Sequence, residues 1–255
     1  MIEIWLKVLL IAGLLIALMG LLSAAVRRLG LPAEWGRKLL HLGMGSITLS
    51  FPWLIGRRAP VLVLAALAGA WLLAVRISPR LMVRFGPALH AVDRPSWGEI
   101  HFAAGTAISY LLAGGDALRF VLPMAVLTWA DTAAAGVGAR RSTHRHPIGI
   151  HDKSWEGCAA FFAVSFVFTF AALSLGTHAH FSEKLSIAVQ FAFDTTGLEI
   201  IGTRGADNLL IPIGGSSLLP LLLNASPVVP AVRLGLAAAL MALWRTRRST
   251  AVGAL

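Results

Sequence analysis

The sequence predicts an all-α fold, a polytopic membrane helix bundle with eight or nine transmembrane helices. Hydrophobic residues make up 57% of the 255 positions and charged residues only 13%, which is more apolar surface than a soluble domain of this length buries. The apolar residues collect in stretches of about the length that crosses a bilayer. Because no polar stretch is long enough to form a separate soluble domain, we expect residues 1–255 to form a single integral membrane domain.

Nine apolar stretches define the expected helices in chain order. They cover residues 4–26, 39–55, 59–75, 100–114, 119–138, 157–176, 185–203, 208–224 and 226–244. The fourth stretch is short, and the eighth contains the run from Gly214 to Ser217, so a broken or re-entrant helix is the alternative at both places. No small-residue cleavage pattern follows the first stretch before Arg27, and we therefore expect this helix to be retained.

The basic residues predict how the bundle is oriented. Lys and Arg number 22 against 12 Asp and Glu, a net charge of +10. In a soluble protein this excess would suggest a nucleic-acid partner, but in a membrane chain it first reports topology, because basic loops stay in the cytoplasm. With nine helices and the amino terminus outside, most basic residues fall in loops on one side. We therefore expect a multi-pass protein with cytoplasmic basic loops and no nucleic-acid partner. Its single cysteine, Cys158, excludes an internal disulfide.

Asp131 is the first candidate site residue, because a carboxylate inside an apolar span is costly in lipid and is usually functional. It lies in the fifth stretch and is followed by small residues as far as Gly138, which allow a neighbouring helix or a ligand to approach closely. The alternative is a structural acid that hydrogen-bonds to a neighbouring helix. The functional interpretation predicts that Asp131 binds a metal ion or accepts a proton.

The loop at residues 139–157 is the most polar part of the chain and has the features of an anion-binding site. Ser154 is placed to cap the next helix, so free backbone N–H groups would lie beside Lys153, an arrangement that suits phosphate. Glu156 falls in the first turn of that helix, where it would stabilise the helix dipole or hold a cation. The alternative is an ordinary positive-inside loop with a helix cap.

Two further groups of basic residues flank the expected cytoplasmic ends of helices. Arg140 and Arg141 follow the Asp131 helix and are candidates for nucleotide phosphate contacts. Arg37 and Lys38 stand at the start of the second stretch, with His41 one turn deeper. Basic residues at such positions are often interfacial anchors only, and this alternative stays open for all four. The histidine is the less expected residue of the group.

Glu199, Asp207 and Asn208 meet where the seventh and eighth stretches are joined. Carboxylate and amide oxygens are ligands of the kind that Mg²⁺ takes when it also binds substrate phosphates and water. The alternative is a polar turn in which Asp207 or Asn208 caps the eighth helix. The sequence therefore predicts a Mg²⁺ site formed by Asp131, Glu156, Glu199 and Asp207. Asp194, near the middle of a span, has no partner evident from the sequence.

Five short motifs together resemble those of the CTP-dependent polyprenol kinase family, which includes dolichol kinase and phytol kinase. The family order is kept over about residues 37–212. The similar segments are Arg37-Lys38 with His41, Gly98-Glu99 with Phe102, Asp131 with Ala134 and Gly138, Lys153-Ser154 with Glu156-Gly157, and Asp207-Asn208 with Pro212. One departure is that Gly138 is not followed by the second glycine of the family's Gly-Arg-x-x-Gly turn, so the nucleotide loop is expected to differ.

The resemblance implies a membrane kinase that transfers the terminal phosphoryl group of CTP to a long-chain isoprenoid alcohol, with Mg²⁺ as cofactor and a cytoplasmic active site. Asp131, Lys153 and Asp207 are its expected catalytic residues. Related members act on diacylglycerol. A looser likeness to phosphatidate cytidylyltransferase leaves cytidylyl transfer open as a second reaction. An ion-coupled transporter is the alternative of another class, against which stand the absence of internal repeats and the concentration of acids at one face.

Overall fold

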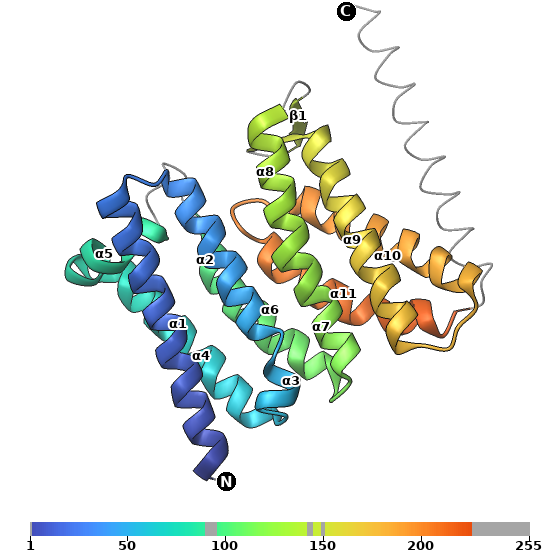
Figure 1. Ribbon diagram of the computed structural model, residues 1–255, viewed down its shortest axis with the longest axis horizontal. Coiled ribbons are helices and arrows are strands. Elements are labelled where there is room, and N and C mark those ends of the chain that lie inside the picture. Colours follow the sequence, from blue (N-terminus) through green and yellow to red (C-terminus); the bar gives the residue numbers. More distant parts are fainter. Residues whose placement is uncertain (1, 90–95, 142–144, 149–150, 226–255) are drawn as a thin grey trace, which may run out of the picture.

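The computed structural model describes residues 2–89, 96–141, 145–148 and 151–225 (Figure 1). The stretch predicted at 226–244 lies outside these residues. The first half of the chain forms α1 (Ile2–Leu29), α2 (Ala33–Thr48), α3 (Phe51–Leu54), α4 (Arg58–Ile77), α5 (Pro79–Phe85), a 3₁₀ turn (Gly86–Ala88) and α6 (Gly98–Ala113).

The predicted stretch at 39–55 is therefore two helices rather than one. The chain turns after α2, and Pro52 lies in the first turn of α3. Proline fits a helix start because N–H groups in the first turn have no acceptor within the helix, so the missing N–H of proline costs no hydrogen bond. Pro79 likewise opens α5, and Ser78 before it is extended, as the residue before a proline usually is. Neither α3 nor α5 was predicted as a separate element.

The second half of the chain continues the helical bundle around one short hairpin. Its elements are α7 (Ala117–Ala125), a π-helical turn (Val126–Ala130), α8 (Asp131–Arg141), β1 (Arg145–Ile148), β2 (His151–Ser154), α9 (Trp155–Gly176), α10 (Phe181–Ile201) and α11 (Asp207–Leu223). β1 and β2 pair antiparallel, with Arg145 opposite Ser154 and Ile148 opposite His151. This hairpin occupies the polar loop, where the sequence predicted no strand. Figure 1 shows it at the end of the bundle opposite the amino terminus.

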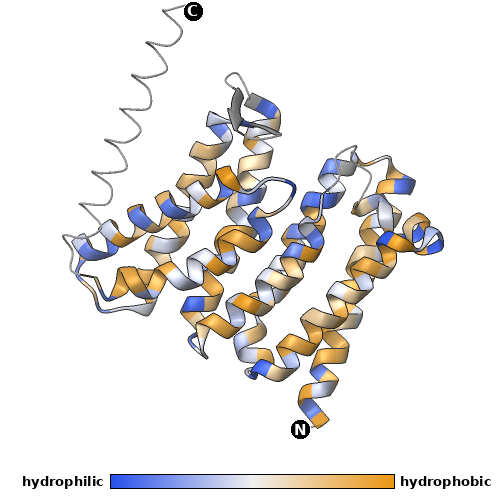
Figure 2. Ribbon diagram, turned by 180° about the vertical axis from the view of Figure 1, so that it is seen from behind, coloured by the Kyte–Doolittle hydropathy of each residue, from blue (hydrophilic) through white to orange (hydrophobic). Residues whose placement is uncertain are grey.

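Four helical segments of the described chain are long and apolar enough to cross a membrane. They are Ile2–Leu29, Arg58–Ile77, Ala117–Arg140 and Trp155–Gly176. The predicted count of eight or nine is not confirmed, since α2, α6 and α11 have only 16, 16 and 17 residues and α10 carries four ionisable side chains. Figure 2 shows hydrophobic residues along most of α1 and α4, and many hydrophilic residues near the end of the bundle opposite the amino terminus.

The segment from α7 to α8 is one long helix with a π-helical turn directly before Asp131. Pro123 lies inside α7 and has no N–H to donate to the carbonyl of Arg119 one turn earlier. The Ser216 hydroxyl of α11 donates to that carbonyl at 3.0 Å, and the Ser109 hydroxyl lies 2.6 Å from Ser216. Because π turns are rare and occur often at functional sites, this local change in helix geometry marks the place where Asp131 is presented.

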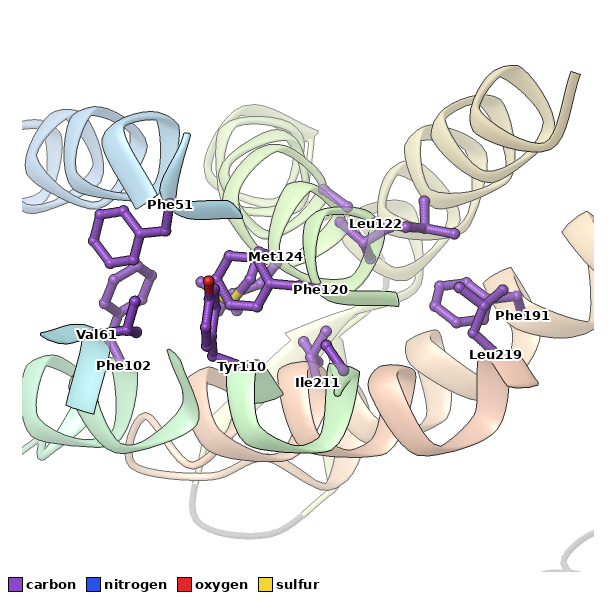
Figure 3. Close-up of a cluster of buried hydrophobic side chains, with 14 of the residues drawn as sticks. Phe51, Val61, Phe102, Tyr110, Phe120, Leu122, Met124, Phe191, Ile211 and Leu219 are labelled. Carbon is purple, nitrogen blue, oxygen red and sulfur yellow. The ribbon is translucent and has the colours of Figure 1, made fainter. Parts of the chain in front are cut away.

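The larger hydrophobic core runs through the bundle and takes buried side chains from α1, α3, α4, α6, α7, the π turn, α8, α9, α10 and α11. Figure 3 shows its aromatic side chains, including Tyr110 and Phe120, whose rings meet edge to face with centroids 5.0 Å apart. Phe102 continues this core toward α2, where its ring meets the His41 ring edge to face at 5.5 Å. The core thus packs directly against one of the predicted site residues.

Candidate functional site

Lys38 of α2 and Asp131 of α8 form a largely buried ion pair. The Lys38 ammonium donates to Asp131 Oδ2 at 2.8 Å, and the two side chains are 11% and 14% exposed. His41, one turn further along α2, places its Nε2 at 3.7 Å from the same carboxylate oxygen and at 3.2 Å from the carbonyl oxygen of Leu127. The structure therefore brings together two of the predicted clusters, which lie 93 residues apart in the sequence.

A close approach between α2 and the π turn makes this pair possible. A Cβ atom added to Gly45 would lie 2.2 Å from Thr128 Oγ1 and 2.5 Å from Thr128 Cγ2. Thr128 is fully buried and donates its hydroxyl to the carbonyl of Met124, so it has no room to move aside. Only glycine fits between the two backbones here, and the contact holds α2 at the distance that Lys38 needs to reach Asp131.

Replacement of Gly45 by alanine is expected to separate α2 from the π turn and weaken the Lys38–Asp131 contact. Gly69→Ala in α4 is the matched control, because a Cβ atom there meets nothing within 4 Å. In detergent, Gly45→Ala should lower the unfolding temperature by several degrees, an overpacking cost of about 1–3 kcal/mol, while Gly69→Ala leaves it unchanged or raises it. Equal unfolding temperatures for the two variants would contradict the proposed packing constraint.

Lys153 and Glu199 form a second ion pair, between the end of β2 and the end of α10. Lys153 Nζ lies 2.7 Å from Glu199 Oε1 and also donates to the Glu199 backbone carbonyl. The predicted cap of the following helix is confirmed, since Ser154 Oγ accepts the N–H of Gly157 at 3.0 Å at the start of α9. Glu156 lies in that first turn, as expected. The hairpin therefore delivers Lys153 to the positive end of α9.

The connection from α10 to α11 packs tightly against the start of α6. Gly205 has a φ of +84°, and a Cβ atom there would lie 2.4 Å from the Cα of Gly98. Asn208 Nδ2 donates to the Gly98 carbonyl at 2.8 Å, which ties α11 to α6. The capping alternative for this turn is not observed, because the N-cap of α11 is Ala206, without a side-chain cap. Asp207 instead accepts the N–H of Asn208 at 3.0 Å.

Gly205→Ala is expected to disrupt this connection more strongly than backbone strain alone would. Gly115→Ala provides the control, since Gly115 also has a positive φ, +104°, but open space around it. Both variants incur the cost of a left-handed backbone, about 1–2 kcal/mol. The Gly205 variant adds a clash with backbone atoms of α6 and should unfold at a clearly lower temperature in detergent. If the two variants lost the same stability, the close contact between Gly98 and Gly205 would not constrain this connection.

The two ion pairs and Asp207 belong to one electrostatic cluster. Asp207 lies within the electrostatic influence of both carboxylates and both lysines, and Glu199 interacts with Asp131 and Lys38 as well as with Lys153. Burial, reinforced by the negative charge of Asp131, raises the pKa of Asp207 to about 6. Asp131, Glu199 and Asp207, from α8, α10 and α11, therefore lie close enough in the structure to interact electrostatically.

A polar cleft of about 530 Å³, partly open to its surroundings, lies beside this cluster. Its lining combines Arg37 and His41 of α2, Gly98 and Phe102 of α6, and Asn208 of α11. The sequence reasoning placed Gly98 and Phe102 in a motif but not among the site residues. The remaining polar residues of the lining are Ser96 and Glu99. Glu99 Oε1 accepts a hydrogen bond from Arg76 Nη1 at 3.1 Å. The sequence did not indicate Arg76 as a partner at this site, because it lies at the end of a long apolar helix.

The other predicted residues lie at the edge of the cluster. Arg37 forms an ion pair with Glu34 at 2.8 Å, and the Arg140 guanidinium lies over the Trp35 ring at 5.8 Å. Arg141 ends α8, and its side chain is outside the described residues. Asp194 does have a partner, because Gln190 Nε2 donates to Asp194 Oδ1 at 2.8 Å within α10. That hydrogen bond gives Asp194 a structural role away from the cleft.

The donor set fits a Mg²⁺ ion that is shared with substrate phosphates. Among the described residues, no three His, Cys, Asp or Glu side chains converge to form a metal cage. Mg²⁺ does not require one, since it is commonly bound by one or two carboxylates together with phosphate oxygens and water. Asp131 and Asp207 supply such oxygens, and within the described chain Asp207 forms no ion pair with a basic side chain.

The structure has several helical segments of membrane-spanning length and a buried ionic cluster beside a polar cleft. These features define the class of the protein: an integral membrane protein with a polar site inside its helical bundle. Over 200 residues the chain is 32% identical to a phytol kinase from Synechocystis sp., an alignment that covers 77% of this chain and 83% of the relative. The chain belongs to the phytol kinase family, among the polyprenol kinases. No protein-family model matches the chain, and no solved structure matches it significantly.

Proposed function

We propose that this protein transfers the terminal phosphoryl group of CTP to the hydroxyl of a long-chain isoprenoid alcohol, phytol or a related polyprenol, with Mg²⁺. The observation that carries the proposal is the buried Lys38–Asp131 pair with His41 beside the polar cleft, in a chain of the phytol kinase family. An ionic cluster of this kind is too costly inside a membrane bundle to serve packing alone. CTP as the donor follows from the family resemblance.

Asp131 accepts the proton of the alcohol in this mechanism. The alcohol oxygen forms a bond to the terminal phosphorus of CTP, the bond from that phosphorus to the bridging oxygen breaks, and CDP leaves. The hydroxyl proton passes to the Asp131 carboxylate. Lys38 orients this carboxylate through its 2.8 Å hydrogen bond, and His41 packs between the carboxylate and Phe102. Positioning and charge stabilisation supply most of the rate, as is general for phosphoryl transfer.

The nucleotide phosphates bind where the hairpin meets α9. Lys153, the positive end of α9 and Arg140 offer positive charge to them, and Arg141 extends the basic set in sequence. Asp131 and Asp207 are the carboxylates that would hold Mg²⁺, together with phosphate oxygens and water. The ion would neutralise the charge that develops on the phosphoryl oxygens. The excess of basic residues in the predicted loops supports a cytoplasmic location for this end of the bundle, where CTP would be available.

A product assay with purified protein tests the proposal. The protein is incubated with Mg²⁺ and either CTP or ATP labelled in the terminal phosphate, against a panel of farnesol, phytol, a polyprenol and diacylglycerol. We expect labelled alkyl phosphate and CDP from CTP, and loss of product on chelation of Mg²⁺. Pyrophosphate and a CDP-lipid would indicate cytidylyl transfer instead. The absence of any nucleotide binding at millimolar concentration would favour the transporter alternative.

A further inference from the structure

An apolar groove lies between α1, α2 and α4, next to the polar cleft. It is partly open to its surroundings, and none of the side chains that line it is charged. Ala12 and Met19 line it from α1, Leu64 and Ala68 from α4, and Met44 from α2. The proposed mechanism uses no residue of α1 or α4. The groove therefore takes no part in the phosphoryl transfer itself.

We propose that the groove binds the hydrocarbon chain of the lipid alcohol whose hydroxyl reacts in the polar cleft. The inference rests on the proposed function and adds to it the residues that select the substrate. Met44 lines both the groove and the cleft, so the two spaces adjoin at this side chain. His41, which faces Asp131, precedes Met44 by three residues, or about 4.5 Å along the α2 axis. A substrate with its hydroxyl at His41 therefore has an apolar space directly beside its first carbons.

The groove runs along two helices of membrane-spanning length. Its lining extends over residues 12–19 of α1 and 64–72 of α4, which corresponds to about 10 Å and 12 Å along their axes. The lining positions recur every three or four residues on each helix, so each helix presents one continuous apolar face to the groove. A groove of this length takes the first part of a long chain, and the remainder of the chain lies in the surrounding lipid.

The chemistry of the groove favours a branched hydrocarbon chain over a headgroup. Its lining offers almost no polar surface, so a phosphate or a sugar would lose its hydrogen bonds there. A chain that leaves the bilayer for the groove gains little hydrophobic free energy, since lipid is already apolar. Its affinity comes from van der Waals contact with the lining, and such contact depends on shape. The groove is therefore a place where alcohols of different length are discriminated.

Narrowing the groove tests its role. Ala68→Phe fills it from α4, whereas Ala66→Phe adds the same side chain at an exposed position of α4 that does not line it. With Ala68→Phe we expect kcat/KM for phytol to fall about tenfold or more, with farnesol affected less because its shorter chain needs less of the groove. Ala66→Phe should match the wild type. Equal losses for the two alcohols, or no loss for phytol in a variant that unfolds like wild type, would refute the proposal.

Direct chain contact gives a second measurement that does not need catalysis. Phytol carrying a photoreactive diazirine on its chain is cross-linked to the full-length protein in detergent–lipid micelles, and the modified peptides are identified by mass spectrometry. We expect labels on α1 and α4 at the groove, reduced by excess phytol and not by excess phospholipid. Labels removed equally by phospholipid would show that bulk lipid fills the groove. A wild-type protein without kinase activity would refute the proposed function, and the cross-linking pattern would still decide whether the groove binds the alcohol.

Discussion

Asp131→Asn is expected to reduce kcat for alcohol phosphorylation about 10³-fold, and to lower the unfolding temperature because the buried Lys38 ammonium loses its ion-pair partner. Asparagine keeps the shape and an oxygen that accepts from Lys38, but it neither takes up the hydroxyl proton nor holds a cation with full charge. Loss of a positioned proton acceptor alone accounts for about 10²–10⁴-fold. The measurement is single-turnover transfer from labelled CTP at saturating phytol, which separates the chemical step from binding.

Asp116→Asn is the matched control for this variant, on the same long helix but at its opposite end. Asp116 caps α7 by accepting the N–H of Arg119 at 3.2 Å, and asparagine caps helices equally well. Its activity should equal that of wild type. A second comparison removes both charges of the pair with Lys38→Met and Asp131→Leu together, which should recover stability without activity. Activity in Asp131→Asn at the wild-type rate would exclude Asp131 from the mechanism.

Lys153→Ala is expected to raise KM for CTP and to lower kcat/KM for CTP by about 10²-fold or more. The variant loses the cation nearest to the proposed phosphate site and leaves Glu199, which is 7% exposed, without its ion-pair partner. An unpaired buried charge destabilises by about 3–5 kcal/mol, so the unfolding temperature should fall as well. Nucleotide titration at fixed alcohol concentration measures the first effect, and thermal unfolding in detergent measures the second.

Two controls separate the binding role of Lys153 from its structural role. Lys184→Ala removes a lysine at the opposite end of α10 and should leave both KM and stability unchanged. Lys153→Met combined with Glu199→Gln removes both charges, which should restore stability while KM for CTP stays high. If that double variant regained normal KM, Lys153 would serve only to neutralise Glu199.

The long helices could be predicted from the sequence because hydrophobic length is a local property. The predicted stretches 59–75 and 157–176 correspond closely to α4 (Arg58–Ile77) and α9 (Trp155–Gly176). The break between α2 and α3 falls inside one apolar run and leaves no composition signal. The run from Gly214 to Ser217 does not interrupt α11, because its glycines serve packing: a Cβ atom on Gly214 would lie 2.4 Å from Leu198 and one on Gly215 2.7 Å from Pro123.

The site residues could be predicted by type, but their partners could not. A lone acid in an apolar helix is conspicuous, and Asp131 was identified on that basis. Its pairing with Lys38 depends on how α2 packs against the π turn, a contact between distant segments that no local pattern reports. The same holds for Lys153 and Glu199, which meet only because the hairpin folds back toward the end of α10.

The π turn before Asp131 determines the direction in which this side chain leaves the helix. A regular α-helix advances about 100° per residue, and a π turn accommodates one residue more than an α turn does. Asp131 therefore occupies the angular position around the helix axis that residue 130 would occupy in an α-helix running without interruption from Ala117. Pro123 and the hydroxyl of Ser216 hold the upstream half in place, so the surplus residue is absorbed between them and the acid. The direction in which the Asp131 side chain leaves the helix is thus set by the extra residue of the π turn.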